Sequence, residues 1–171
     1  MDTSPIYREV QHFRQPWVWA LILIGSITLV YGAVQQLVLG KPWGNHPSSD
    51  AGLLVLLVVF GFGMPYLFYL TRLITEVRTD GVYIRYFPIH RSFRRFAFSE
   101  IRSFEAVTYR PIHDYGGWGI RYGKSGKVYN VSGNRGVRLE LTDRHRLLIG
   151  SQKPELLAEA IGSAAGRRKP L

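Results

Sequence analysis

The sequence WVWALILIGSITLVYGAVQQLVL, from Trp17 to Leu39, contains no charged residue. About 20 consecutive apolar residues suffice to carry a helix across the hydrocarbon core of a bilayer, so this stretch predicts a membrane-spanning helix. A second uncharged stretch, AGLLVLLVVFGFGMPYLFYL, runs from Ala51 to Leu70. Joined by the turn-rich loop from residue 40 to residue 50, the two predict a transmembrane hairpin over residues 17–70, with helices at 17–39 and 51–70.

Two other interpretations of the apolar stretches are weaker. A signal peptide has an apolar region of about 7–15 residues and a cleavage site of small residues, whereas the first stretch is longer and no such site follows it cleanly. Buried helices of a soluble protein need a surrounding core, and 171 residues cannot enclose two helices that are apolar on every face. Gln35 and Gln36 fit either the membrane interface or a contact with the second helix, and Pro65 predicts a mild bend.

Positive charges near the helix ends predict the orientation. Arg8 and Arg14 precede the first span, Lys41 alone lies in the connecting loop, and several arginines follow the second span from Arg72 onward. The positive-inside rule therefore places both termini in the cytoplasm of a multi-pass protein of the inner or plasma membrane, with residues 1–16 as a cytoplasmic segment. The part from Arg72 onward holds 19 Lys and Arg against 9 Asp and Glu, which accounts for the entire net charge of +10.

The sequence lacks the residues that several classes of chemistry require. The chain has no cysteine, which excludes disulfides, Cys-ligated metals and Cys nucleophiles. The five histidines, His12, His46, His90, His113 and His145, have no metal-ligand spacing, so we expect no metal site. We also expect no catalytic residues and no cofactor, because no Ser/His/Asp arrangement or carboxylate pair can be proposed from spacing alone.

After the second span, over residues 71–166, the hydrophobic pattern changes from continuous to alternating, as is typical of β-strands. The segment from Ile74 to Arg78, an Asp-Gly turn and the segment from Val82 to Phe87 predict a hairpin whose residues Tyr83, Arg85 and Phe87 share one face. Further strands are predicted at 94–98, 101–109, 118–122, 127–131, 136–141 and 146–149.

The sequence QKPELLAEAIGSAAG then predicts a closing helix, with Ser151 before it as N-cap and Pro154 in the first turn. Residues 167–171 are a basic tail. The expected fold is an α+β membrane protein: a two-helix hairpin, then an antiparallel β-barrel or sandwich with a C-terminal helix. We expect the fragment from about Thr71 to Leu171 to fold alone.

The segments TEVRTDGVYIRYFPI, FSEIRSFEAVTY, DYGGWGIRYG, KVYNVSGNRGVRLELTD and RLLIGSQKPELLAEAI follow the two spans. In this combination the chain resembles the bacterial membrane proteins with a pleckstrin-homology-like (PH-like) domain. The resemblance covers Thr75 to Ile161 and is most specific from Gly116 to Gly119 and from Gly150 to Glu155. It implies about seven strands in two near-orthogonal sheets capped by a C-terminal helix, and it implies no catalytic residues.

Two glycine-rich loops invite functional readings. The Walker spacing would need glycine where Trp118 stands, and the dinucleotide pattern would need glycine where Tyr122 stands, so both nucleotide motifs fail. Turn chemistry is the leading explanation of residues 116–119 and 130–135, ahead of a contact with a partner. The partner-contact candidates in and beside these loops are Trp118, Arg121, Asn134 and Arg135.

A cluster of arginines lies within about twenty-five residues of the second span: Arg72, Arg78, Arg85, Arg91, Arg94 and Arg95. Each Lys or Arg held near an anionic leaflet contributes about 1 kcal/mol of attraction, so these residues are candidates for binding lipid headgroups. An equally good interpretation is that these arginines only set the membrane topology and keep the domain soluble. A free basic domain would suggest nucleic acid, but the membrane anchor makes anionic lipid the nearer partner, and we expect no nucleic-acid binding.

The leading functional hypothesis is a non-catalytic, membrane-anchored binding or scaffold module that contacts anionic headgroups or a membrane protein partner. The alternative is an accessory subunit of a membrane enzyme or transporter complex. Uncharged spans argue against a transporter acting alone, because substrate paths need polar or ionisable residues inside the membrane.

Overall fold

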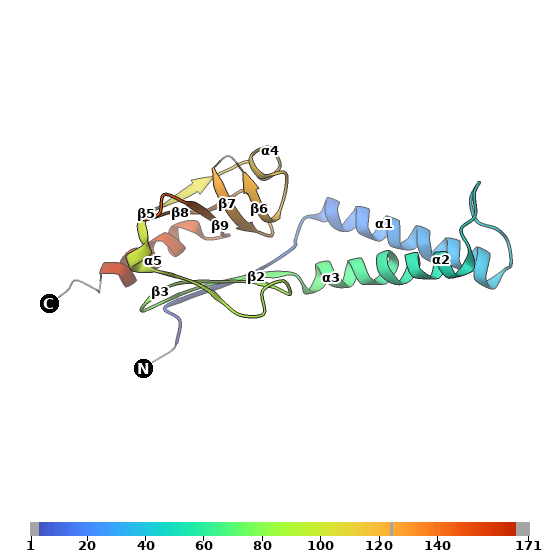
Figure 1. The fold of residues 1–171 in the computed structure, drawn as a ribbon, viewed down its shortest axis with the longest axis horizontal. Coiled ribbons are helices and arrows are strands. Elements are labelled where there is room, and N and C mark those ends of the chain that lie inside the picture. Colours follow the sequence, from blue (N-terminus) through green and yellow to red (C-terminus); the bar gives the residue numbers. More distant parts are fainter. Residues whose placement is uncertain (1–3, 124, 167–171) are drawn as a thin grey trace. The chain divides into compact units, whose positions relative to one another are not determined.

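The computed structural model describes residues 4–123 and 125–166, which separate into two compact units. Residues Arg14–Leu70 form the helical unit, and the chain on both sides of it, up to Phe13 and from Thr71, forms the β-rich unit. The α+β class is as the sequence predicts (Figure 1). The predicted basic tail at 167–171 lies outside the described residues.

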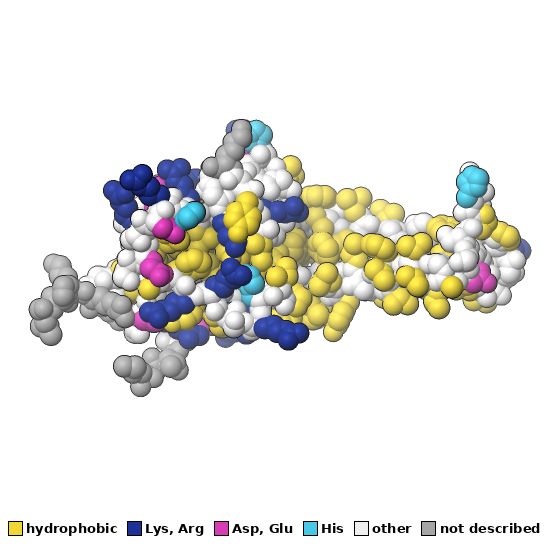
Figure 2. All heavy atoms as spheres, viewed as in Figure 1, with side chains coloured by type: hydrophobic (Ala, Val, Ile, Leu, Met, Phe, Trp, Pro, Cys, Tyr) yellow, Lys and Arg dark blue, Asp and Glu magenta, His cyan; other side chains and the backbone are white. Residues whose placement is uncertain are grey.

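Two helices, Pro16–Val38 and Asp50–Leu70, make up the helical unit. The first consists of α1 (Pro16–Ala33) and the π-helical η1 (Val34–Val38), and the second of α2 (Asp50–Leu56), the π-helical η2 (Leu57–Gly63) and α3 (Met64–Leu70). Their mean hydropathies are 2.0 and 2.3, and only 11% of the most apolar window of each is buried. Leu21, Ile24 and Ile27 are each more than 60% exposed. Both helices are therefore long and apolar enough to cross a membrane, and Figure 2 shows apolar side chains along their visible surface.

Local chemistry explains the ends of these helices. Pro16 occupies the first turn of α1, where a missing N–H leaves no bond unmade. Ser49 caps α2 by accepting a backbone N–H of the first turn at 3.2 Å. The side-chain amide of Gln36 donates to the carbonyl of Ser48 at 2.7 Å and to the carboxylate of Asp50 at 2.8 Å. Of the two expected roles for this glutamine, the contact with the second helix is the observed one.

The turn before Pro65 is π-helical. The N–H of Met64 bonds to the carbonyl of Val59, five residues earlier. Because Pro65 has no N–H to donate, the α-helical ladder is interrupted near it, and a π-helical turn is one of the ways in which helices accommodate an interruption.

The first sheet of the β-rich unit is antiparallel and has the order β1-β2-β3-β4. Its strands are β1 (Tyr7–His12), β2 (Arg72–Arg78), β3 (Gly81–Phe87) and β4 (Arg94–Ala97). The predicted hairpin is confirmed as β2 and β3. Strand β1 corrects the expectation that residues 1–16 stand apart from the domain, because it pairs along β2 from Tyr7 with Val77 to His12 with Arg72.

The second sheet has the order β5-β8-β9-β7-β6. Its strands are β5 (Ile101–Thr108), β6 (Gly119–Gly123), β7 (Gly126–Asn130), β8 (Arg135–Leu141) and β9 (Arg146–Gly150). The expectation of a wholly antiparallel domain with about seven strands is wrong in two respects, because the described residues hold nine strands and β7 runs parallel to β9. Of the two expected architectures, a barrel or a sandwich, the closed barrel is not formed by the described residues.

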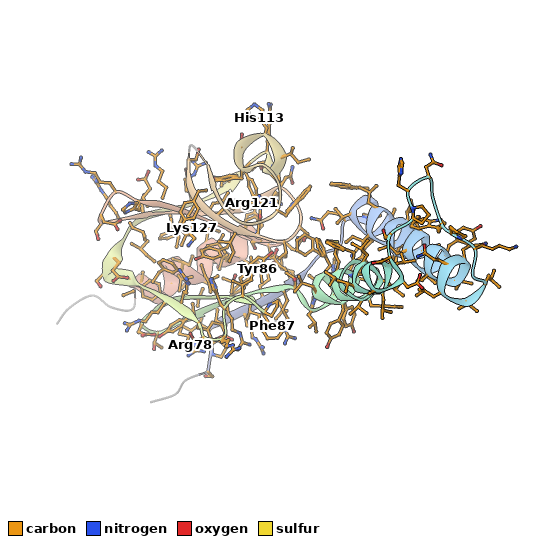
Figure 3. All side chains as sticks on the ribbon, turned by 45° about the vertical axis from the view of Figure 1, so that its right-hand side comes forward. Arg78, Tyr86, Phe87, His113, Arg121 and Lys127 are labelled. Carbon is orange, nitrogen blue, oxygen red and sulfur yellow. The ribbon has the colours of Figure 1, made fainter. Side chains whose placement is uncertain are left out.

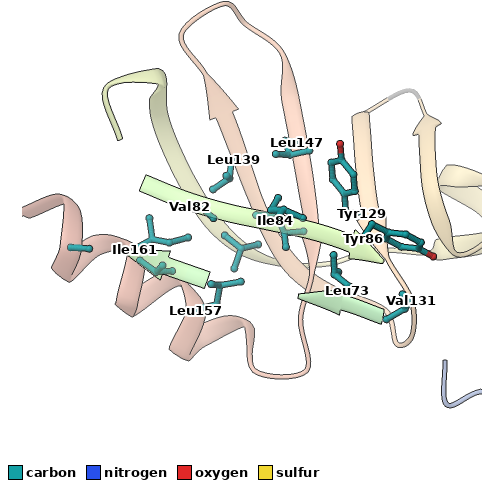
Figure 4. Packing of buried hydrophobic residues seen from close by; sticks show 14 residues of the cluster. Leu73, Val82, Ile84, Tyr86, Tyr129, Val131, Leu139, Leu147, Leu157 and Ile161 are labelled. Carbon is teal, nitrogen blue, oxygen red and sulfur yellow. The ribbon is translucent and has the colours of Figure 1, made fainter. Parts of the chain in front are cut away.

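The two sheets and the C-terminal helix share one apolar core. Strands β2 and β3 contribute Leu73 and Ile84, the second sheet contributes Leu139, and α5 (Pro154–Gly166) contributes Leu157 and Ile161, all fully buried (Figure 4). Helix α5 contacts both sheets, through β2 and β3 and through β5 and β8. The closing helix is therefore confirmed, and it packs against two sheets whose strands do not pair with each other.

A smaller apolar cluster supports the opposite side of the second sheet. It consists of Tyr109, Tyr115, Val128 and Leu148, with the rings of the two tyrosines 5.9 Å apart in an edge arrangement. Tyr115 belongs to the short helix α4 (Pro111–Tyr115), and η3 (Phe98–Glu100) joins the sheets.

Candidate functional site

The outward surface of the first sheet carries five arginines, which we call the basic face: Arg8, Arg72, Arg78, Arg85 and Arg95. Side chains alternate along a strand, so the residues between the core positions of β2 and β3 point away from the core. Arg72 is paired with Phe87, and Tyr83 with Arg95, which places aromatic rings among the arginines. Figure 3 shows Arg78 and Phe87 on this side of the sheet and the buried Tyr86 on the other.

Aromatic rings hold three of these guanidinium groups. The guanidinium carbon of Arg72 lies 4.9 Å from the centre of the Phe87 ring, and that of Arg78 lies 4.4 Å from the centre of the Tyr83 ring. Arg85 lies 4.7 Å from the Phe93 ring, which Arg78 also contacts at 5.3 Å. Cations over ring faces are attracted by the ring quadrupole, and arginine can stack there and still present N–H donors at its edge.

Two acidic residues neutralise part of the basic face. Glu76 is only 6% exposed and lies 2.6 Å from Arg78 and 3.4 Å from Arg8. Asp80 pairs with Arg95 at 2.9 Å. Three of the five arginines thus have a carboxylate partner.

Arg72 and Arg85 are the two arginines of this face that form no ion pair with a described carboxylate. Their Nε atoms are buried and have no hydrogen-bond partner among the described residues. No described carboxylate therefore neutralises the charge of either arginine, and their stacking on Phe87 and Phe93 fixes the position of the guanidinium groups.

The six arginines proposed from sequence do not form one cluster. Arg72, Arg78, Arg85 and Arg95 share the basic face, whereas Arg94 is paired with the core residue Ile84 and points to the opposite side. Arg91 is exposed in the loop at 88–93. The structure therefore does not place all six on one surface, because successive residues of a strand point to opposite faces.

On the other side of the sheet, Arg94 belongs to a second group, the inner cluster, with His90, Lys127 and Tyr129. The Lys127 ammonium lies 4.9 Å from the centre of the Tyr129 ring and 5.1 Å from that of Tyr122. The His90 ring packs edge-on against Tyr129, with centroids 5.6 Å apart. Burial lowers the pKa of His90, and the charges of Arg94 and Lys127 lower it further. The histidine thus favours its neutral form in an electropositive setting.

The two glycine-rich loops lie side by side. The indole N–H of Trp118 donates to the carbonyl of Gly133 at 2.9 Å. The side chain of Asn130 joins the same region, since its oxygen accepts the N–H of Gly119 at 2.8 Å and its amide donates to the Tyr109 hydroxyl at 2.9 Å. Gly116, Gly117 and Gly119 all have positive φ angles, which explains the glycines.

The partner-contact candidates in these loops have internal roles. The carbonyl of Asn134 accepts the N–H of Tyr109 at 2.8 Å, and Arg135 forms an ion pair with Glu155 of α5. The Arg121 guanidinium donates to the carbonyl of Trp118 at 3.4 Å. These contacts account for the loops by turn chemistry and by packing against α5, which is the reading that the sequence favours.

Sequence reasoning missed three features of the site. No local sequence pattern placed Arg8 at this site, because only a long-range pairing brings β1 beside β2. Phe93 lies in a loop, where alternation gives no orientation. Ile89, next to Pro88 in the same loop, is 67% exposed, and a large apolar side chain beside the exposed Arg91 is a combination that suits a membrane interface. Within residues 4–123 and 125–166, no three His, Asp or Glu side chains come together as a metal site.

A family of unknown function, DUF6141, matches residues 1–167, and the chain belongs to this family. No curated protein matches the chain.

Proposed function

We propose that this member of the DUF6141 family is a non-catalytic, membrane-anchored module whose β-rich unit binds anionic lipid headgroups. The observation that carries the proposal is the basic face, on which Arg72 and Arg85 are stacked on aromatic rings and have no carboxylate partner among the described residues. Arg72 lies only two positions after the end of the second apolar helix, so the chain itself keeps this end of the face near the point where the helix ends.

The helical unit supports a membrane anchor. Its two helices are 23 and 21 residues long, and the apolar side chains along them are largely uncovered. Burying this surface in a bilayer removes it from water without requiring further protein, since all backbone groups of a helix are bonded within it. We place the anchor in the inner or plasma membrane.

The pairing of β1 with β2 supports a hairpin topology by an argument independent of charge. The chain leaves β1 into the first helix and returns from the second helix into β2, and these two strands are hydrogen-bonded neighbours. If both helices cross the membrane, they must cross in opposite directions. Arg14 and Arg72 flank the outer ends of the helices and Lys41 alone lies in the loop, which favours a cytoplasmic β-rich unit.

Single cysteines test this orientation, because the natural chain contains none. An impermeant thiol reagent should label Ser48→Cys in intact cells, and it should label Ser125→Cys only after lysis. Labelling of Ser125→Cys without labelling of Ser48→Cys would show that the orientation is reversed.

The PH-like assignment remains part of the proposal. Two packed sheets with a helix that closes the core support it, whereas the parallel β7–β9 pair and the strand β1 supplied from before the first span are departures from the expected pattern. The lipid-binding role does not depend on this assignment, since it rests on the basic face.

A soluble version of the β-rich unit allows a direct binding test. His12 and Arg72 are register partners, so a short Gly/Ser turn can join Phe13 to Thr71 in place of Arg14–Leu70. This joined unit should float with vesicles that contain phosphatidylglycerol and remain free with vesicles of phosphatidylcholine alone. Binding should weaken as salt rises, because surface attraction decays over about 10 Å at 0.1 M salt.

Two double variants separate the basic face from general positive charge. Arg72→Gln with Arg85→Gln should weaken vesicle binding by roughly 30-fold, since each arginine near an anionic surface contributes about 1 kcal/mol. Arg110→Gln with Lys153→Gln removes the same charge from exposed positions outside the first sheet and should weaken binding much less. Equal losses in the two variants, or equal binding to both kinds of vesicle, would contradict the proposal and favour an accessory subunit held by protein contacts.

A further inference from the structure

A cavity of about 260 Å³ lies beside the turn between β8 and β9, away from the first sheet that carries the basic face. It is lined by Arg102, Glu140, Leu141, Arg144 and Arg146. Three of these five residues are arginines that come from three different segments: β5, the β8–β9 turn and β9.

Three features of the backbone bring the arginines together. The register between β5 and β8 shifts between Ile101 and Ser103, so Arg102 is the residue at the irregularity, where a bulge redirects a side chain. Arg144 has a φ of 66° in the turn, a conformation that is uncommon for a residue other than glycine, and its N–H bonds to the carbonyl of Leu141 at 3.0 Å. Arg146 is paired directly with Glu140 across the strands.

Glu140 forms hydrogen bonds within the lining of this cavity but does not neutralise the charge of all three arginines. Its carboxylate accepts the Ser103 hydroxyl at 3.1 Å and the Nε of Arg146 at 3.2 Å. Neither Arg102 nor Arg144 forms an ion pair with a carboxylate of the described residues. Asp143, in the same turn, is engaged by His145 at 2.8 Å, and hydrogen bonds from His145 lower the pKa of Asp143. The lining of the cavity therefore carries an excess of two positive charges.

We propose that this cavity binds a phosphomonoester group. Such a group carries a charge of about −1.5 to −2 near neutral pH, which matches the excess of the lining, and it offers three acceptor oxygens. Guanidinium groups pair with phosphate through parallel N–H donors, and three of them approaching from different segments can engage different oxygens. The volume suits a headgroup or a small metabolite rather than a nucleotide, because sites for drug-sized ligands begin at about 300 Å³.

The test uses the full chain in nanodiscs of phosphatidylcholine, titrated with inorganic phosphate at pH 7.5 in a calorimeter. We expect saturable binding with a dissociation constant of about 1 mM or tighter. Arg102→Gln and Arg144→Gln should each weaken binding by about tenfold, because each removes a charged hydrogen bond to the anion. The control Arg110→Gln removes an equal charge from an exposed residue that does not line the cavity and should leave binding unchanged.

A fourth variant distinguishes a site from a merely basic surface. Glu140→Gln releases Arg146 from its ion pair and removes the one negative charge of the lining, so it should tighten phosphate binding. Binding should also weaken from pH 7.5 to pH 5.5, because protonation of the phosphate dianion removes one of its negative charges over this range. Absence of saturable binding, an equal loss in Arg110→Gln, or no gain in Glu140→Gln would overturn the proposal.

The phosphomonoester can belong to a lipid or to a soluble compound, and the same assay separates the two. Phosphatidic acid added to the nanodisc should weaken the apparent affinity for inorganic phosphate if the cavity reaches lipid headgroups. An unchanged affinity would assign the site to a soluble phosphate ester. The vesicle test of the basic face uses Arg72 and Arg85, which do not line this cavity, so either proposal can fail without the other.

Discussion

Glu9 of β1 joins the N-terminal strand to the segment that leads into α5. One oxygen of its carboxylate accepts the Ser151 hydroxyl at 2.6 Å and the Tyr7 hydroxyl at 2.9 Å, and the other accepts the N–H of Gln152 at 2.7 Å. Beside it, the Gln11 side chain donates to the carbonyl of Gly150 at 2.7 Å in a buried position. Replacing Glu9 by alanine therefore removes the acceptor of three hydrogen bonds in one step.

The contacts of Glu9 give the expected magnitude. A hydrogen bond to a charged group contributes about 1.5–3 kcal/mol to stability, and an unmade bond at a buried group adds a desolvation penalty. Glu9 is only half-buried and its three bonds share one carboxylate, so they do not add in full. We expect Glu9→Ala to lower the free energy of unfolding of the β-rich unit by about 2–4 kcal/mol.

Urea unfolding of the joined β-rich unit measures this loss. Trp118 is the only tryptophan in that unit, so its fluorescence reports the transition without interference from the helical unit. The matched control is Glu159→Ala, which removes an exposed carboxylate from α5 and should change stability by less than about 0.5 kcal/mol. A loss in Glu9→Ala no larger than that of the control would refute the role of Glu9 in holding β1.

Three further predictions use the same unfolding assay. Gly126→Ala should destabilise the unit by about 2 kcal/mol or more, because Gly126 has a φ of 100° and a Cβ there would collide with the carbonyl of Arg146; stability equal to the natural unit would contradict this. Ile161→Ala should cost about 2–5 kcal/mol, since Ile161 is fully buried, whereas Leu156→Ala on the exposed side of α5 should cost much less. The lowered pKa of His90 means that the unfolded chain binds this proton at a higher pH than the folded chain, so stability should fall as pH drops below about 6.5. His90→Asn should make that fall shallower, and an identical pH profile would contradict the assignment.

Local patterns predicted the elements whose determinants are close in sequence. The uncharged runs predicted the two long helices, the Asp-Gly turn predicted the β2–β3 hairpin, and the spacing of Leu157 and Ile161 predicted α5. Each of these depends on hydrophobic periodicity or turn chemistry within one short segment. The alternation likewise predicted that Tyr83 and Arg85 share one face of β3, which became part of the candidate site.

Elements that depend on long-range pairing were not predictable in this way. Strand β1 has the composition of a polar segment, with Glu9 and Gln11 among its residues, and only its partners in β2 and before α5 make it a strand of this domain. The parallel pairing of β7 with β9 follows from the order of the second sheet, which local turn signals do not specify.

The sequence alone determined that the chain has two apolar helices and a basic, strand-rich remainder, because length, charge and periodicity are properties of contiguous residues. Tertiary structure decided which charges act together. It separated Arg94 from Arg95, paired Arg78 with Glu76, and gathered Arg102 and Arg144 at one cavity. The physical reason is that a strand presents neighbouring residues to opposite faces, while a bulge and a left-handed turn redirect side chains by geometry that no local composition specifies.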